Sequence, residues 1–117
     1  MNDKNKQIQR KYPEMIAAVD LGSNSFHLIV ARVDEHGNFS MVDQMKEMVR
    51  LRGGLDEHNN MDEAVAQNAL ECLERFGDRI GHLESEAVRA AGTNTLRTMN
   101  KSASFLRKAK KALGHSI

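Results

Sequence analysis

A small polar segment lies between two apolar segments near the start of the chain, in AAVDLGSNSFHLIV at residues 17–30. It contains one glycine, two serines and one asparagine: Gly22, Ser23, Asn24 and Ser25. A loop of these residue types could direct several N–H and hydroxyl donors at one phosphate group. The preceding Asp20 would repel that anion unless a divalent cation lay between them, and Mg²⁺ bound by one carboxylate plus phosphate oxygens and water is usual. The alternative is an ordinary turn between two strands.

A second segment, GTNTLR at residues 92–97, has similar chemistry. Thr93 could cap a short helix whose N-terminus faces an anion, with Asn94 as a further donor. Arg97 could then hold a phosphate through both guanidinium nitrogens. The alternative here is a capped turn followed by a surface arginine. Two such loops at strand ends of one sheet strengthen the phosphate-binding interpretation of each.

Three strands are predicted to position the first loop, at residues 16–21, 26–33 and 39–51. The loop between the first two is too short for a crossover, so these strands should be antiparallel neighbours. Their apolar residues are consecutive rather than alternating, which indicates strands covered on both faces. The third strand alternates imperfectly and should lie near a sheet edge. A turn at 34–38 should place Gly37 at positive φ.

Two helices and one further strand follow. Asn60 and Glu63 resemble a capping box for the first helix, with Asp62 as a competing cap, and this helix should end near residue 81. A short strand is predicted at 86–91. A last helix should be capped by Ser102 and end at Gly114. The order β-β-β-α-β-α predicts an α/β fold with a mixed sheet and helices packed on it.

Composition suits one soluble domain at residues 15–117, preceded by a flexible tail at 1–14. The chain has 117 residues, 40% of them hydrophobic, and a net charge of about +1, which does not favour nucleic acid as a partner. Its single cysteine, Cys72, allows no internal disulfide and fits the cytoplasm. Cys72 lies on the apolar helix face and should be a packing residue. No segment is long and apolar enough to be expected to span a membrane.

Three segments together resemble one enzyme family. AAVDLGSNSFHLIVARV is similar to the first phosphate-binding motif of the exopolyphosphatase / guanosine pentaphosphate phosphohydrolase family. KEMVRLRGGL resembles the third-strand segment of that family, although LRGGL departs from its commoner glycine-acid-glycine pattern, and AAGTNTLR resembles its G-T-x-T-L-R segment. The resemblance runs from about residue 15 to the end and is closer to exopolyphosphatase.

The resemblance implies a fold, a reaction and a set of site residues. The fold is the ribonuclease-H-like first lobe of the actin, sugar-kinase and chaperone ATPase superfamily. The reaction is Mg²⁺-assisted hydrolysis of the terminal phosphate of inorganic polyphosphate, or of guanosine pentaphosphate, by a bacterial cytoplasmic enzyme or one peripheral to the inner membrane face. Asp20 would lie beside the metal, and Arg50 would support the site. The phosphate-binding residues would be Gly22, Ser23, Asn24, Ser25, Thr93, Asn94 and Arg97.

The same resemblance implies that the lobe is incomplete. A fifth strand, a glutamate that activates water and a second phosphate loop would follow Ile117, so this chain alone is expected to be inactive. His27 is interpreted as a packing histidine rather than a base. The intact protein is expected to be a homodimer, and the unpaired sheet edge favours strand exchange or self-association of the 117 residues. Two rival functions remain open, a kinase or ATPase lobe and a non-catalytic phosphate-chain sensor.

Overall fold

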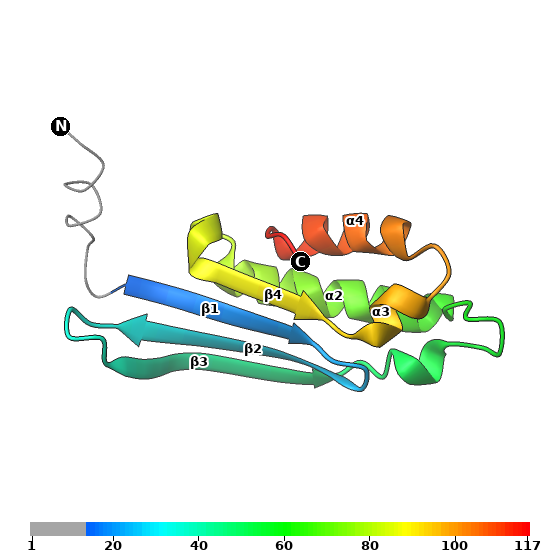
Figure 1. Ribbon diagram of the computed structural model, residues 1–117, viewed down its shortest axis with the longest axis horizontal. Coiled ribbons are helices and arrows are strands. Elements are labelled where there is room, and N and C mark those ends of the chain that lie inside the picture. Colours follow the sequence, from blue (N-terminus) through cyan, green and yellow to red (C-terminus); the bar gives the residue numbers. More distant parts are fainter. Residues whose placement is uncertain (1–13) are drawn as a thin grey trace.

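The computed structural model describes residues 14–117, so the predicted tail lies outside the described residues except for Glu14, which begins the first strand. Four strands and three α-helices follow one another in the predicted β-β-β-α-β-α order, with one extra short helix (Figure 1). The strands are β1 (Glu14–Leu21), β2 (Ser25–Val33), β3 (Phe39–Met48) and β4 (Val88–Gly92). The helices are α2 (Glu63–Ile80), α3 (Asn94–Thr98) and α4 (Ser102–Leu113), with 3₁₀ turns at Arg52–Gly54 and Ser85–Ala87.

The four strands form one mixed sheet in the order β3-β2-β1-β4. β1 and β2 are antiparallel, as are β2 and β3. β4 lies parallel to β1, and α2 provides the crossover that a parallel neighbour requires. The mixed sheet and the edge position of β3 are therefore confirmed. The parallel pairing also means that β1 and β4 end at the same end of the sheet.

The hydrophobic core lies between one face of the sheet and the helices α2 and α4, which run side by side (Figure 1). The close approach of the two helices depends on Gly77, because a Cβ there would lie 2.7 Å from the Ala112 carbonyl oxygen. The largest fully buried side chains come from both layers: Leu21, Phe26, Leu28, Leu51, Cys72, Leu73, Phe76, Ile80 and Leu113. Cys72 is a packing residue as predicted, and burial raises the pKa of its thiol to about 12.

The opposite face of the sheet is open, which contradicts the prediction that β1 and β2 are covered on both faces. Burial alternates along β1, and Ala18 is exposed between the buried Ala17 and Val19. Its cross-strand partner on β2, Ile29, is 40% exposed. The consecutive apolar residues arise because this second face also carries small and branched apolar side chains, although no described element packs over it. Apolar side chains of this open face, including Ala18 and Ile29, border a depression of about 450 Å³.

The third strand is three residues shorter than predicted, because the chain turns inward after Met48. Val49 and Leu51 are both buried in the core, and Arg50 between them has a φ of 56°. That left-handed conformation interrupts the regular extended backbone of a strand. The 3₁₀ turn at Arg52–Gly54 then leads the chain toward α2.

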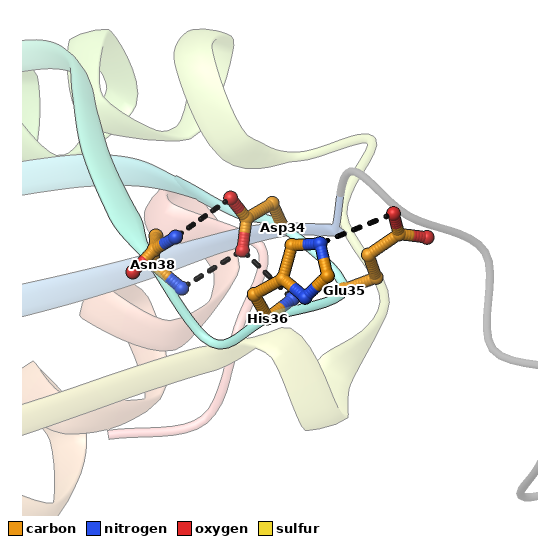
Figure 2. Close-up of polar contacts among 4 residues, drawn as sticks. All are labelled: Asp34, Glu35, His36 and Asn38. Atoms are coloured by element: carbon orange, nitrogen blue, oxygen red, sulfur yellow. Dashed lines mark hydrogen bonds and ion pairs between the residues drawn. The ribbon is translucent and has the colours of Figure 1, made fainter.

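Two turns share the pattern Asp-Glu-His-x-Asn and the same hydrogen bonds. In the β2–β3 turn, the Asp34 carboxylate accepts from the backbone N–H of His36 and of Asn38, both at 2.9 Å (Figure 2). Gly37 has the predicted positive φ. The second turn, at residues 56–60, forms the same bonds around Asp56, and Asn59 takes the left-handed position with a φ of 63°. Residues 56–60 therefore form a tight Asx turn.

The helix caps differ in part from the prediction. Asp62, rather than Asn60, caps α2, and its carboxylate accepts from the Val65 N–H at 3.1 Å. Ser102 is the first residue of α4 rather than its cap, because Lys101 precedes it in a left-handed conformation. Gly114 ends α4 with a φ of 81°, as predicted. Within the described part of the chain, no helix has both the length and the apolar character that crossing a bilayer requires.

Candidate phosphate-binding site

The two polar loops meet at one end of the sheet, where β1 and β4 terminate together (Figure 1). Leu21 pairs in register with Gly92, and the Thr93 N–H donates to the Leu21 carbonyl at 3.3 Å. The hydrogen bond therefore continues the parallel pairing one step beyond β4. In α/β sheets, ligands bind beyond the carboxyl ends of the strands, which is the location of both loops.

Three hydroxyl groups join the loops directly. The Ser23 Oγ lies 2.8 Å from the Thr95 Oγ1 and 3.2 Å from the Thr93 Oγ1. Thr93 occupies the N-cap position of α3, but its side chain makes no capping hydrogen bond. Thr93 therefore lies at the predicted cap position, but the prediction that its side chain caps the helix is wrong, because its hydroxyl bonds to Ser23 instead. The two loops form one connected unit.

A third segment holds the first loop from its other side. The Arg50 N–H donates to the Asn24 carbonyl at 2.7 Å, and the Arg52 N–H donates to the Ser23 carbonyl at 3.0 Å. Arg50, the first residue that makes this contact, has a left-handed backbone conformation. Arg50 therefore supports the loop through its backbone, while its side chain is exposed. Both carbonyls are therefore satisfied by backbone donors.

The turn itself requires a glycine. The Gly22 N–H donates to the Ser25 carbonyl at 3.1 Å, which closes the loop. A Cβ at Gly22 would lie 2.7 Å from that same carbonyl oxygen, closer than real Cβ atoms approach backbone. Within residues 14–117, the amides of Ser23 and Asn24 have no acceptor. Two consecutive free N–H groups on a short loop are suited to an anion.

Ser25 and His27 lie beside the loop on β2. The His27 Nε2 is 3.3 Å from the Ser25 Oγ, and the ring is half-buried. His27 alternates with the buried Phe26 and Leu28, so it lies on the open face of the sheet, directly opposite Asp20 in the β1–β2 register. His27 is therefore a half-buried residue of the open face and not a core residue, because its buried neighbours Phe26 and Leu28 point to the other face.

The Asp20 carboxylate is suited to be one ligand of a divalent cation. Its carboxylate is exposed, and it makes no hydrogen bond or ion pair with any residue of the described range. No group of three or more His, Cys, Asp or Glu side chains within residues 14–117 could hold a metal ion by itself. A free single carboxylate next to a phosphate loop suits Mg²⁺, which usually keeps several waters and binds substrate phosphates.

Asn94 and Arg97 lie on α3 and are both exposed. Neither side chain bonds to the first loop, and Arg97 borders a cavity of about 310 Å³ beside β4 together with Gly92 and Thr93. The structure thus brings Ser23 and Thr93 into contact, while the guanidinium of Arg97 has no partner among residues 14–117. Sequence reasoning did not select two residues that contact the first loop, Thr95 and Arg52, although both belong to the quoted motifs. Residue type reveals neither the burial of Thr95 nor the backbone hydrogen bond of Arg52.

Comparison with known proteins gives consistent matches. The model of the Ppx/GppA phosphatase family matches residues 29–117, which include the second loop and begin within β2. A guanosine-5'-triphosphate,3'-diphosphate pyrophosphatase of Vibrio vulnificus is 43% identical over 103 residues, covering 88% of this chain and 20% of that protein. The corresponding protein of Vibrio cholerae is 42% identical over 103 residues, with the same coverage of each chain. The chain therefore spans about a fifth of the length of these relatives.

Solved structures share the fold. The PPX-GPPA enzyme of Aquifex aeolicus superposes with a TM-score of 0.75 at 24% identity, covering 88% of this chain and 35% of that chain. An exopolyphosphatase of Cytophaga hutchinsonii gives a TM-score of 0.75 at 23% identity, covering 88% of this chain and 33% of that chain. The predicted ribonuclease-H-like, actin-like lobe is therefore the fold of this chain.

Proposed function

Because this chain belongs to the Ppx/GppA phosphatase family, we propose that it is the first phosphate-binding lobe of an acid-anhydride hydrolase that releases terminal phosphate from a phosphate chain. The observation that carries this proposal is the contact of the Ser23 hydroxyl with Thr93 and Thr95. That contact joins two donor-rich loops at the end of one sheet. A single such loop could be a turn, but two loops bonded into one unit provide a preorganised anion site.

Each residue of the site has a proposed role. The free amides of Ser23 and Asn24, with the Ser25 hydroxyl, donate to oxygens of the phosphate chain. Arg97 approaches the phosphate chain from α3 and neutralises charge, since no group of the described residues binds its guanidinium. Asp20 would hold Mg²⁺, which when bound supplies Lewis-acid neutralisation of phosphate charge. As the family resemblance implies, we place the water-activating base outside this chain; the His27 ring is bonded to the Ser25 hydroxyl and is not assigned that role.

Two substrates fit this chemistry. Inorganic polyphosphate is the substrate indicated by the residues of the second loop. Guanosine pentaphosphate is favoured equally by another observation, because relatives 41–43% identical are named as guanosine-5'-triphosphate,3'-diphosphate pyrophosphatases. Both substrates present a terminal phosphoanhydride to the same loops, so residues 14–117 bind the feature that the two share.

A chimera tests the proposal. This chain would replace the matching 103 residues of the Vibrio vulnificus relative, and phosphate release with Mg²⁺ would be measured from long-chain polyphosphate and guanosine pentaphosphate side by side. We expect release by the chimera and none by the 117 residues alone, because phosphoryl transfer depends on groups on both sides of the phosphate. The preferred substrate identifies the subfamily.

The rival functions predict different results. Phosphoryl transfer from ATP to an acceptor, with both phosphate chains left intact, would favour a kinase or ATPase lobe. Tight binding without turnover by a correctly folded chimera would favour a sensor. Turnover by the 117 residues alone would refute the proposal that the base lies outside them.

A further inference from the structure

Thr95 is more deeply buried than the other described polar residues. It is 5% exposed and is the one polar residue in the buried class within residues 14–117. It lies in the first turn of α3 next to Leu96, which is also buried. Because a buried hydroxyl lacks water as a partner, its hydrogen bonds must be made within the protein. The side-chain partner of Thr95 is the Ser23 Oγ, at 2.8 Å.

The direction of this hydrogen bond follows from the number of protons. Each hydroxyl has one proton to donate and two lone pairs that accept. If Ser23 donated to Thr95, the buried Thr95 proton would have no acceptor among the described side chains, which is unfavourable. If Thr95 donates to Ser23, both groups are satisfied. Ser23 is half-buried at the loop surface, so its proton can reach a ligand.

The neighbouring Thr93 strengthens the same arrangement. Its Oγ1 lies 3.2 Å from the Ser23 Oγ and can donate to the second lone pair. Ser23 would then accept two hydrogen bonds and keep its own proton for an anion. A hydroxyl oriented in this way before binding loses less rotational freedom when the ligand arrives.

We propose that Thr95 is a positioning residue, which donates to Ser23 and thereby directs the Ser23 proton to an oxygen of the bound phosphate chain. This role rests on the proposed function, because it assumes that the loop binds phosphate. Thr95 does not touch the ligand. It acts through Ser23 alone, so its effect on binding depends on Ser23 being present.

The dependence on Ser23 gives a discriminating experiment. The binding of tripolyphosphate with Mg²⁺ would be measured by calorimetry for this chain and for Thr95→Val, Thr95→Ser, Ser23→Ala and the Ser23→Ala/Thr95→Val double variant. Valine preserves the shape of threonine and removes the donor. From the usual net strength of one hydrogen bond, Thr95→Val should weaken binding about 2- to 10-fold, and Thr95→Ser should retain affinity near that of the unaltered chain.

The double variant separates positioning from general structural damage. If Thr95 acts through Ser23, Thr95→Val should change affinity little once Ser23 is alanine. Equal affinity of Thr95→Val and the unaltered chain would overturn the inference, as would a full loss repeated in the Ser23→Ala background. Should Thr95→Val fail to fold by circular dichroism, the donor-retaining Thr95→Ser would decide, because a loss of affinity there contradicts the proposal. Absence of binding by the unaltered chain would instead refute the proposed function.

Discussion

The Gly22→Ala substitution tests the loop geometry on which the site depends. The added Cβ would lie 2.7 Å from the Ser25 carbonyl oxygen. This oxygen is backbone, and it accepts the 3.1 Å hydrogen bond from the Gly22 N–H that closes the loop. The contact can be relieved only if the loop opens, and the opening would move Ser23 away from its two threonine partners.

The expected cost combines two effects of similar size. Losing a closing hydrogen bond costs about 0.5–1.5 kcal/mol net, and local backbone strain costs on the order of 1–3 kcal/mol. We therefore expect Gly22→Ala to lower the free energy of unfolding by about 1.5–4.5 kcal/mol. With a urea slope of about 2 kcal/mol per molar for a small domain, the unfolding midpoint should fall by about 1–2 M.

The assay is urea unfolding followed by circular dichroism, combined with calorimetric binding of tripolyphosphate and Mg²⁺. Gly53→Ala is the matched control, because a Cβ there meets no atom within 4 Å. That substitution should stay within about 0.5 kcal/mol of the unaltered chain. Equal stability and equal affinity for the two alanine variants would refute the argument that Gly22 closes a strained, functional loop.

Three further predictions concern the scaffold. Asp62→Ala should cost about 1 kcal/mol by removing the α2 cap, measured as a fall of about 4–8 °C in the thermal midpoint. Glu47 bonds to Arg75 at 2.9 Å, and this contact lowers the pKa of the Glu47 carboxyl below its ordinary 4.5. Its stabilisation is thus fully present above pH 4.5 and is lost as pH falls through the lowered pKa, so Glu47→Gln should matter at pH 6 and progressively less as pH falls below 4.5. The outer edges of β3 and β4 should promote association in sedimentation experiments at high concentration.

Each scaffold prediction has its own control. Asn68→Ala changes an exposed residue of the same helix that does not cap it, so a loss there as large as for Asp62→Ala would contradict the cap assignment. A Glu47→Gln effect that grew as pH fell would reverse the sign derived from the ion pair with Arg75. A single monomeric species at all concentrations would argue against exposed pairing edges.

The element order could be predicted because strong local signals carry it. Helical spacing of apolar residues identified α2 and α4, and Gly37 and Gly114 marked chain reversals that the structure confirms with positive φ values. The burial of the sheet could not be predicted in the same way. Ala18 and Ile29 are apolar whether or not another layer covers them, so a consecutive apolar pattern does not distinguish two covered faces from one.

The residue types of the candidate site could be selected from the sequence, but the contacts between them could not. Ser23 and Thr95 are 72 positions apart in the sequence, and the parallel pairing of β1 with β4 brings their hydroxyls together. Residue type suggested that Thr93 would cap a helix, yet a nearby serine is a competing partner for its hydroxyl. The role of Arg50 was also hidden, because it depends on backbone conformation and not on the charged side chain.

Residue-resolved NMR would show whether the two loops bind one phosphate chain. Tripolyphosphate with Mg²⁺ would be titrated into this chain while backbone amide resonances are followed. We expect saturable shifts at Ser23, Asn24 and residues 93–97, with the turn around Asp34 at the far end of the sheet unchanged. Shifts confined to the lysine-rich end of α4, or none at the two loops, would contradict it.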